Sequence, residues 1–310
     1  MTKLTKFLKD LAYKLHSHIY SCFNRGLGKS NFKPLKVLKG ESSNRLISAM
    51  VMEWLNQSEI YTKKKKSLGN SSDIWDYRYD FYDDLPIEIR AYIYSHFIGD
   101  NSICDHLRAH FGFQPRLQTI ELLYNYPNHR LSEEGSKLWH RDHDCDFKNT
   151  KVFIMLTPIH SGNGPFYYLN NSHLNTIRHK ISSDTESSNT WLRGRITNAK
   201  FTQKCDDICT TEGFQQGDTI MIDTVNLYHK GGFCKESTRL LLHASYQGTG
   251  WTSIKKKDFS SEVEYLTSLG VTPDLHKKIR EQDQLIDNQY RPNNLKRFAR
   301  KLNYKLRSIY

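Results

Sequence analysis

Residues 151–159 read KVFIMLTPI, and residues 160–174 continue as HSGNGPFYYLNNSHL. The first stretch is a short run of apolar side chains, and the second is rich in Gly, Asn, Ser and aromatic residues. Short apolar runs bounded by turn residues are typical of β-strands. The two stretches therefore predict a strand followed by a turn-rich connection at the centre of the fold.

Similar short runs recur before and after this stretch, and they predict further strands at 118–126, 166–170, 218–223 and 239–246. Regularly spaced short strands favour a β-sandwich or a jelly-roll barrel. Apolar residues recur at helical spacing over 44–56 and 87–111, and helices are again expected after Ser260. We therefore predict a mainly β protein in which helices flank a jelly-roll core.

The composition excludes several classes of protein. The chain has 310 residues, of which 37% are hydrophobic, and it contains no apolar run near the roughly 20 residues that span a bilayer. This predicts that it is not an integral membrane protein. Its six cysteines include no Cys-x-x-Cys pair, which favours a reduced, cytoplasmic compartment.

The net charge of +12 is concentrated at the two ends of the chain. Residues 1–66 hold 14 basic and 4 acidic residues, residues 253–310 hold 13 and 7, and the middle holds 18 and 22. Both ends also contain apolar residues at helical spacing, which predicts two basic amphipathic helices. Such helices either bind an anionic membrane surface or pack on the body of the protein with solvated basic faces.

We expect three parts in the chain. Residues 1–43 form a basic amphipathic helix and a polar linker, and residues 44–252 form the β domain with an N-terminal helical part. Residues 253–310 form C-terminal helices that end in the second basic amphipathic helix. Within the central domain, 182–190 is expected to be a long polar excursion between strands.

Residues 139–144 read WHRDHD and lie inside the strand-rich region. In an extended strand His140 and Asp142 point to the same face, because side chains alternate with period two. A third ligand, His229, would complete the 2-His-1-carboxylate set that leaves coordination positions open on non-haem Fe(II). A His-x-Asp pair alone is expected about once by chance in such a chain. The order of the surrounding strands makes it specific, since GDTIMIDT precedes His229 and Arg239 opens RLLLHASY.

On these residues the chain resembles the phytanoyl-CoA dioxygenase family of Fe(II)- and 2-oxoglutarate-dependent oxygenases. The resemblance covers about 130 residues, and it rests on WHRD, NGPFYYLNNSH, GDTIMID, His229 and Arg239. It implies a double-stranded β-helix, a cupin-like jelly roll. It also implies that His140, Asp142 and His229 bind iron and that Arg239 binds the distal carboxylate of 2-oxoglutarate. Asn171 stands where the family usually has Gly.

The resemblance implies that 2-oxoglutarate and O2 are consumed while a C–H bond of the substrate is hydroxylated. From their position on the strand before His140, Tyr124 or Tyr126 is a candidate for a further hydrogen bond to 2-oxoglutarate. The expected substrate is a small or lipid-linked molecule, met at the membrane surface if the basic ends bind lipid. One alternative is an oxygenase acting on nucleic acid or protein, although the acidic middle of the chain argues against nucleic acid. The other is a catalytically silent barrel that binds a ligand.

Overall fold

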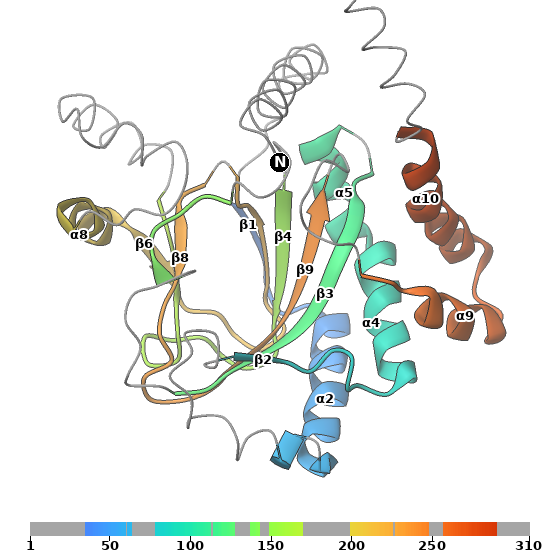
Figure 1. Cartoon of the computed structure of the whole chain (residues 1–310), viewed down its shortest axis with the longest axis horizontal. Helices are drawn as coiled ribbons and strands as arrows, with labels where there is room; N and C mark the ends of the chain where they lie inside the picture. The colour runs from blue at the N-terminus through green and yellow to red at the C-terminus, as the bar shows by residue number, and fades with distance from the viewer. Residues whose placement is uncertain are drawn as a thin grey trace, which may run out of the picture.

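A computed structural model of the protein describes residues 35–59, 61–63, 78–112, 114–127, 137–142, 149–169, 199–225, 227–247 and 257–289. Two β-sheets lie face to face, and helices cover the outer face of the larger one (Figure 1). Both predicted terminal helices and the predicted excursion at 182–190 lie outside the described residues. Among those described, every helix is too short or too polar to span a membrane.

The larger sheet has six antiparallel strands. Their spatial order is β1 (Leu35–Leu38), β7 (Thr219–Asp223), β4 (Asn149–Met155), β9 (Arg239–Gln247), β3 (Arg116–Asn125) and β2 (Arg78–Asp80). The four middle strands are those predicted from the sequence, with ends that differ by a few residues. The predicted strand at 151–159 ends earlier, at Met155, because the chain then turns away from the sheet.

The smaller sheet contains β6 (Thr210–Glu212), β5 (Phe166–Tyr168) and β8 (His229–Gly231) in that spatial order. An isolated bridge between His140 and His229 adds a fourth position beside β8. From β3 onward the chain crosses repeatedly between the two sheets. After β3 in the large sheet, His140 lies beside the small sheet, and the chain then returns to the large sheet as β4. It next forms β5 and β6 in the small sheet, β7 in the large sheet, β8 in the small sheet and β9 in the large sheet. This alternation makes the core a double-stranded β-helix, as predicted.

The strands of the large sheet have one face toward the helices and one toward the small sheet. On β9, Leu240 and Leu242 belong to the core under the helices, whereas Leu241 belongs to a second apolar cluster between the sheets. Adjacent residues separate in this way because side chains alternate along a strand. The register then fixes which side chains of β3 and β4 meet those of β9 in each layer.

Helices α2 (Ser42–Gln57), α4 (Ile87–Gly99) and α5 (Asn101–Phe111) cover the outer face of the large sheet (Figure 1). Two more, α9 (Ser260–Ser268) and α10 (Pro273–Gln289), lie beyond α4. Helix α8 (Ala199–Ile208) is on the opposite side, next to the small sheet. The sequence pattern did not predict α8, nor the short strands β1, β2, β6 and β8.

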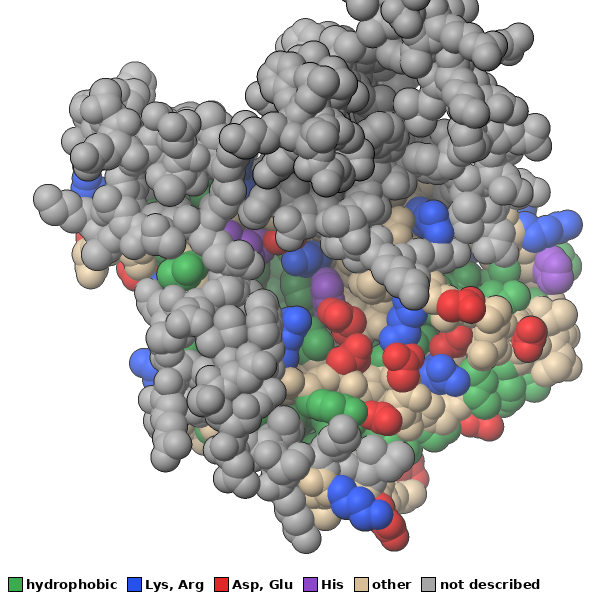
Figure 2. All heavy atoms as spheres, viewed as in Figure 1, with side chains coloured by type: hydrophobic (Ala, Val, Ile, Leu, Met, Phe, Trp, Pro, Cys, Tyr) green, Lys and Arg blue, Asp and Glu red, His purple; other side chains and the backbone are tan. Residues whose placement is uncertain are grey.

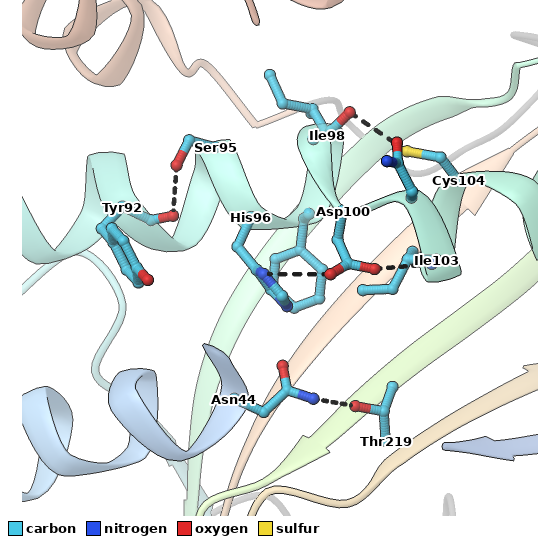
Figure 3. Close-up of polar contacts among 12 residues, drawn as sticks. Asn44, Tyr92, Ser95, His96, Ile98, Asp100, Ile103, Cys104 and Thr219 are labelled. Atoms are coloured by element: carbon cyan, nitrogen blue, oxygen red, sulfur yellow. Dashed lines mark hydrogen bonds and ion pairs between the residues drawn. The ribbon is translucent and has the colours of Figure 1, made fainter. Parts of the chain in front are cut away.

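The helix predicted over 87–111 is two helices that meet at Asp100. The carboxylate of Asp100 accepts a hydrogen bond from the backbone N–H of Ile103, 3.0 Å away, and so caps α5 (Figure 3). Its own backbone is extended, with φ −64° and ψ 123°. An N-cap aspartate ends one helix and starts the next because its side chain replaces a helical hydrogen bond. Apolar periodicity alone did not reveal this break.

The segment 24–43, expected to be a connector, contains β1, which pairs with β7 at the edge of the large sheet. Asn44, in the first turn of α2, then ties the helix to β7. Its amide donates to the hydroxyl of Thr219 at 2.7 Å (Figure 3). It also donates to the carbonyl of Gly217 at 3.1 Å. Asn44 is almost fully buried.

Asn44→Ala should lower the free energy of unfolding by about 1–3 kcal/mol, because it leaves a buried hydroxyl and carbonyl without this donor. Asn56→Ala, at an exposed position of the same helix, should change it by less than about 0.5 kcal/mol. Urea unfolding of both variants measures the difference. Equal stability of the two would show that Asn44 does not anchor α2.

Candidate metal centre

His140 and His229 are held opposite each other by their backbones. The N–H of each donates to the carbonyl of the other, with both distances 3.0 Å. Two residues that exchange both bonds in an antiparallel pair point to the same side of the sheet. Their imidazole rings accordingly lie close together, with centroids 4.3 Å apart, between the two sheets.

Both imidazoles are oriented so that Nε2 is available to a metal. Nδ1 of His140 is 2.7 Å from the carbonyl oxygen of Leu138, and Nδ1 of His229 is 2.9 Å from that of Leu227. A carbonyl only accepts, so Nδ1 carries the proton in each ring and Nε2 keeps its lone pair. Burial, followed by the repulsion that a second protonated ring at His229 would exert, lowers the pKa of His140 to about 3 and so keeps the ring neutral. Burial also lowers the pKa of His229.

Asp142 completes the group two residues after His140. Its backbone N–H donates to the carbonyl of Thr224, 2.9 Å away, and its Oδ1 lies 3.7 Å from Nε2 of His140. Burial alone would raise the pKa of this carboxyl. The ammonium of Lys151, 2.7 Å from Oδ2, and the nearby His229 outweigh burial, so the pKa of Asp142 is lowered.

These three side chains fit a metal ion. One donor atom from each of His140, Asp142 and His229 lies within 4.8 Å of the others. Two ligands that are each about 2.1 Å from one ion are about 3 Å apart at right angles and about 3.6 Å apart at 120°. The 3.7 Å between Nε2 of His140 and Oδ1 of Asp142 is near the wider of these spacings. The donor set is two neutral imidazoles and one carboxylate, and it occupies a single face. The structure thus brings together the three residues that the sequence proposed as ligands.

A pocket extends from the two histidines across the inner face of the large sheet. Its cavity volume is about 130 Å³, some ten times the room that one water needs. Apolar side chains form most of its wall, and polar ones lie at its ends. On the face shown in Figure 2, histidine, basic and acidic side chains lie together near the middle of the view.

Arg239, at the start of β9, lies in the wall of this pocket. Its Nε and Nη2 both donate to Oδ1 of Asn125 at 3.2 Å, and its Nη1 donates to the carbonyl of Gly164. A guanidinium has five N–H groups. Among the described residues, two of them, one on each Nη, therefore have no partner, and two N–H groups are the number that a bidentate contact with a carboxylate uses.

The Asn-Gly-Pro turn at 163–165 explains how Arg239 is held. Gly164 has φ +83°, and a Cβ there would lie 3.0 Å from Nη1 of Arg239. The turn is fixed in place because the N–H of Gly232 donates to the carbonyl of Pro165, 2.6 Å away. A glycine is needed at 164 both for the backbone conformation and for the close approach of the guanidinium.

Tyr124 lies on the other face of β3. Its ring packs against Tyr61, with centroids 5.3 Å apart, and against Phe81 at 6.1 Å, within the core under the helices. It does not line the pocket, and neither does Tyr126. The structure therefore does not bring Tyr124 or Tyr126 to the pocket with Arg239, because alternation puts Asn125, and not its two neighbours, on the inner face.

Sequence reasoning missed Lys151, Asn125 and Arg78, all of which line the pocket. Arg78 pairs in register with Asn125, and Asn125 pairs with Arg239, so the three residues form one row across three strands. The signal for Lys151 was a cation inside an otherwise apolar strand. Its contact with Asp142 follows only from the fold.

Asp206 of α8 contacts the neighbours of both histidines, Trp139 and Lys230. Its Oδ1 accepts from the indole N–H of Trp139 at 2.8 Å and lies 2.6 Å from the ammonium of Lys230. Trp139 precedes His140 and Lys230 follows His229, so these side chains point away from the site. Asp206 therefore connects α8 to both histidine-bearing segments.

No family model matches the chain, and no curated protein matches it. Among solved structures, it is similar to the non-haem alpha-ketoglutarate-dependent epimerase SnoN from nogalamycin biosynthesis, with 12% identity, a TM-score of 0.43 and coverage of 73% of this chain and 81% of SnoN. It is also similar to EctD from S. alaskensis with 2-oxoglutarate and 5-hydroxyectoine, with 14% identity, a TM-score of 0.44 and coverage of 76% of this chain and 81% of EctD. A third similar structure is AviO1 from Streptomyces viridochromogenes Tue57, with 15% identity, a TM-score of 0.45 and coverage of 72% of this chain and 94% of AviO1.

Asp206→Ala should lower the free energy of unfolding by about 1–3 kcal/mol, because the buried indole N–H of Trp139 loses its acceptor and Lys230 loses this ion pair. The neighbouring Asp207 is exposed and contacts Gln203 on its own helix. Asp207→Ala should therefore cost less than about 0.5 kcal/mol. Urea unfolding followed by tryptophan fluorescence measures both, and equal losses would contradict the role of Asp206.

Proposed function

We propose that this chain is a non-haem Fe(II)- and 2-oxoglutarate-dependent oxygenase that hydroxylates a C–H bond of a small molecule. One observation carries the proposal: the donor atoms of His140, Asp142 and His229 lie within 4.8 Å of one another, and the two histidines line the same pocket as Arg239, which has two N–H groups without a partner among the described residues. A metal ligand set and a carboxylate-binding group in one pocket match the needs of this chemistry.

His140, Asp142 and His229 would hold the iron, which leaves further coordination positions open. Bound Fe(II), with 2-oxoglutarate and O2, supplies the oxidative decarboxylation that gives succinate and CO2 and drives oxidation of the substrate. Lys151 holds the side chain of Asp142 in place through its contact with Oδ2. The carbonyls of Leu138 and Leu227 keep the two rings in the ligating tautomer.

Arg239 would bind the distal carboxylate of 2-oxoglutarate and so fix the direction in which this molecule lies. Between Arg239 and the histidines, the wall is formed by apolar side chains such as Leu123, Met155 and Leu241. An apolar wall excludes water and strengthens the ionic contact of the guanidinium. The residues of this chain thus bind, orient and desolvate the co-substrate.

The size of the pocket supports a small molecule, or one group of a larger molecule, as the substrate. A lipid-linked substrate and a membrane location remain predictions from the two basic amphipathic helices expected at the ends of the chain, which lie outside the described residues. A cytoplasmic location likewise remains a prediction from the cysteine pattern.

Anaerobic Fe(II) followed by 2-oxoglutarate should give the weak visible charge-transfer band of this type of complex in the full-length protein. His229→Ala should weaken Fe(II) binding by more than about 100-fold and abolish the band. Loss of a residue that only hydrogen-bonds to a metal ligand already lowers metal affinity by about 10- to 100-fold, and His229 is itself a proposed ligand. His276→Ala, at an exposed position on α10, is the matched control and should behave as wild type. A folded wild type that gives no band would overturn the proposal.

Arg239→Ala should raise the concentration of 2-oxoglutarate needed for half of the band by about 10- to 100-fold, because two charged hydrogen bonds are lost. Arg239→Lys keeps the charge but not the paired N–H groups, so an intermediate value is expected. Titration of Fe(II)-loaded protein measures all three. An unchanged half-saturation in folded Arg239→Ala would show that another group binds the co-substrate.

A further inference from the structure

Lys151 of β4 carries a positive charge into the gap between the two sheets. Its ammonium lies 2.7 Å from Oδ2 of Asp142, and the two side chains are only 23% and 16% exposed. Lysine is rarely buried to this extent without a partner, because its ammonium is strongly hydrated in water. Among the described residues, Asp142 is the carboxylate with which Lys151 forms an ion pair. The ion pair therefore accounts for a lysine at this place.

The strand β4 directs this cation toward the metal ligands. Lys151 is followed on the same face of the strand by Phe153 and Met155, which line the apolar part of the pocket. Burial is the main reason that the pKa values of His140 and His229 are lowered, and the positive charge of Lys151 lowers both further. The charge of Lys151 thus reaches the centre of the candidate metal site.

The two oxygens of Asp142 face different neighbours. Oδ1 lies 3.7 Å from Nε2 of His140, whereas Oδ2 lies beside the ammonium of Lys151. A carboxylate can bind a metal ion through one oxygen or through both. Turning Oδ2 toward a metal would weaken the ion pair, so Oδ1 is the oxygen left for the ion. Asp142 then takes one coordination position instead of two.

The ion pair also changes the charge around a bound metal. The two imidazoles are neutral and Asp142 brings one negative charge, which the ammonium of Lys151 offsets. Glu121, another carboxylate on which Lys151 acts, contacts His243 instead. Fe(III) depends more than Fe(II) on negative charge in its surroundings, because attraction grows with the charge of the ion. Partners of metal ligands tune the redox potential in this way.

We propose that Lys151 is a positioning residue of the metal centre, which keeps Oδ2 of Asp142 away from the metal and favours Fe(II) over Fe(III). The inference rests on the proposed oxygenase function and deepens it, because that function needs open coordination positions and a ferrous ion. Without the ammonium, Asp142 can bind through both oxygens and take a position that the co-substrate or O2 needs. A lysine that only stabilises the fold would change neither the binding mode of Asp142 nor the potential of the iron.

The first test is the Fe(III)/Fe(II) reduction potential of the iron-saturated, full-length protein, measured by anaerobic redox titration with the EPR signal of Fe(III). Lys151→Met removes the charge and leaves an apolar chain of similar length. At a fixed potential it should raise the ratio of Fe(III) to Fe(II) at least about tenfold, a fall of about 59 mV. Lys151→Arg keeps the charge and should stay near wild type, as should Lys277→Met, the control at an exposed position of α10. A wild-type potential in folded Lys151→Met overturns the proposal.

The second test is the binding mode of Asp142, read from infrared difference spectra of ¹³C-aspartate-labelled, full-length protein with and without anaerobic Fe(II). A carboxylate bound through one oxygen shows a wider separation of its two stretching bands than one bound through both. We expect the wide separation in wild type and a narrower one in Lys151→Met, and Asp142→Asn identifies the bands by their loss. A narrow separation in wild type contradicts the proposal without any lysine variant, and an unchanged separation in Lys151→Met contradicts it as well.

These outcomes are distinct from those that test the proposed function. The charge-transfer band of the wild type reports Fe(II) and 2-oxoglutarate binding, whichever way Asp142 binds the metal. A protein that gives this band but shows a narrow separation keeps its proposed function and loses this role of Lys151. The same holds if the band is present and Lys151→Met keeps the wild-type potential. A folded wild type that binds no iron and gives no band loses both.

Discussion

The backbone pair between His140 and His229 is the constraint on which the rest of the site depends. Their two reciprocal hydrogen bonds, each 3.0 Å long, close the small sheet and turn both imidazoles toward the large one. Alternation then sends Trp139 and Lys230 outward, where Asp206 joins them. One register thus sets both the ligand geometry and the attachment of α8.

The register of the large sheet arranges the pocket in the same manner. Arg78, Asn125 and Arg239 form one row across β2, β3 and β9, and Glu121, His243 and Phe153 form another across β3, β9 and β4. The first row places the guanidinium of Arg239 in the wall of the pocket, and the second places the imidazole of His243 there, in contact with Glu121. Because β-sheet register shifts in steps that exchange the two faces, neither row tolerates a slip of one residue.

Much of the fold and the metal ligands could be predicted from the sequence because they depend on local patterns. The strands β3, β4, β7 and β9 contain apolar runs bounded by turn residues, and His140 and Asp142 are only two residues apart in the sequence. What could not be predicted depends on pairing between distant segments. The sequence did not show which face of β3 carries Tyr124, because that face is set by pairing with other strands. The Lys151–Asp142 contact joins β4 to the segment that follows His140. The short strands β2 and β8 gave no periodic signal, since three residues are too few to show one.

X-ray absorption at the iron edge of the full-length chain, loaded anaerobically with Fe(II), tests the central claim most directly. The multiple-scattering features of imidazole report how many histidines bind the metal. The account predicts two imidazoles with oxygen ligands in wild type, and one in His229→Ala if enough iron is retained at high Fe(II) concentration. Sulfur ligation, or a wild-type spectrum without imidazole, would contradict a metal centre built from His140, Asp142 and His229.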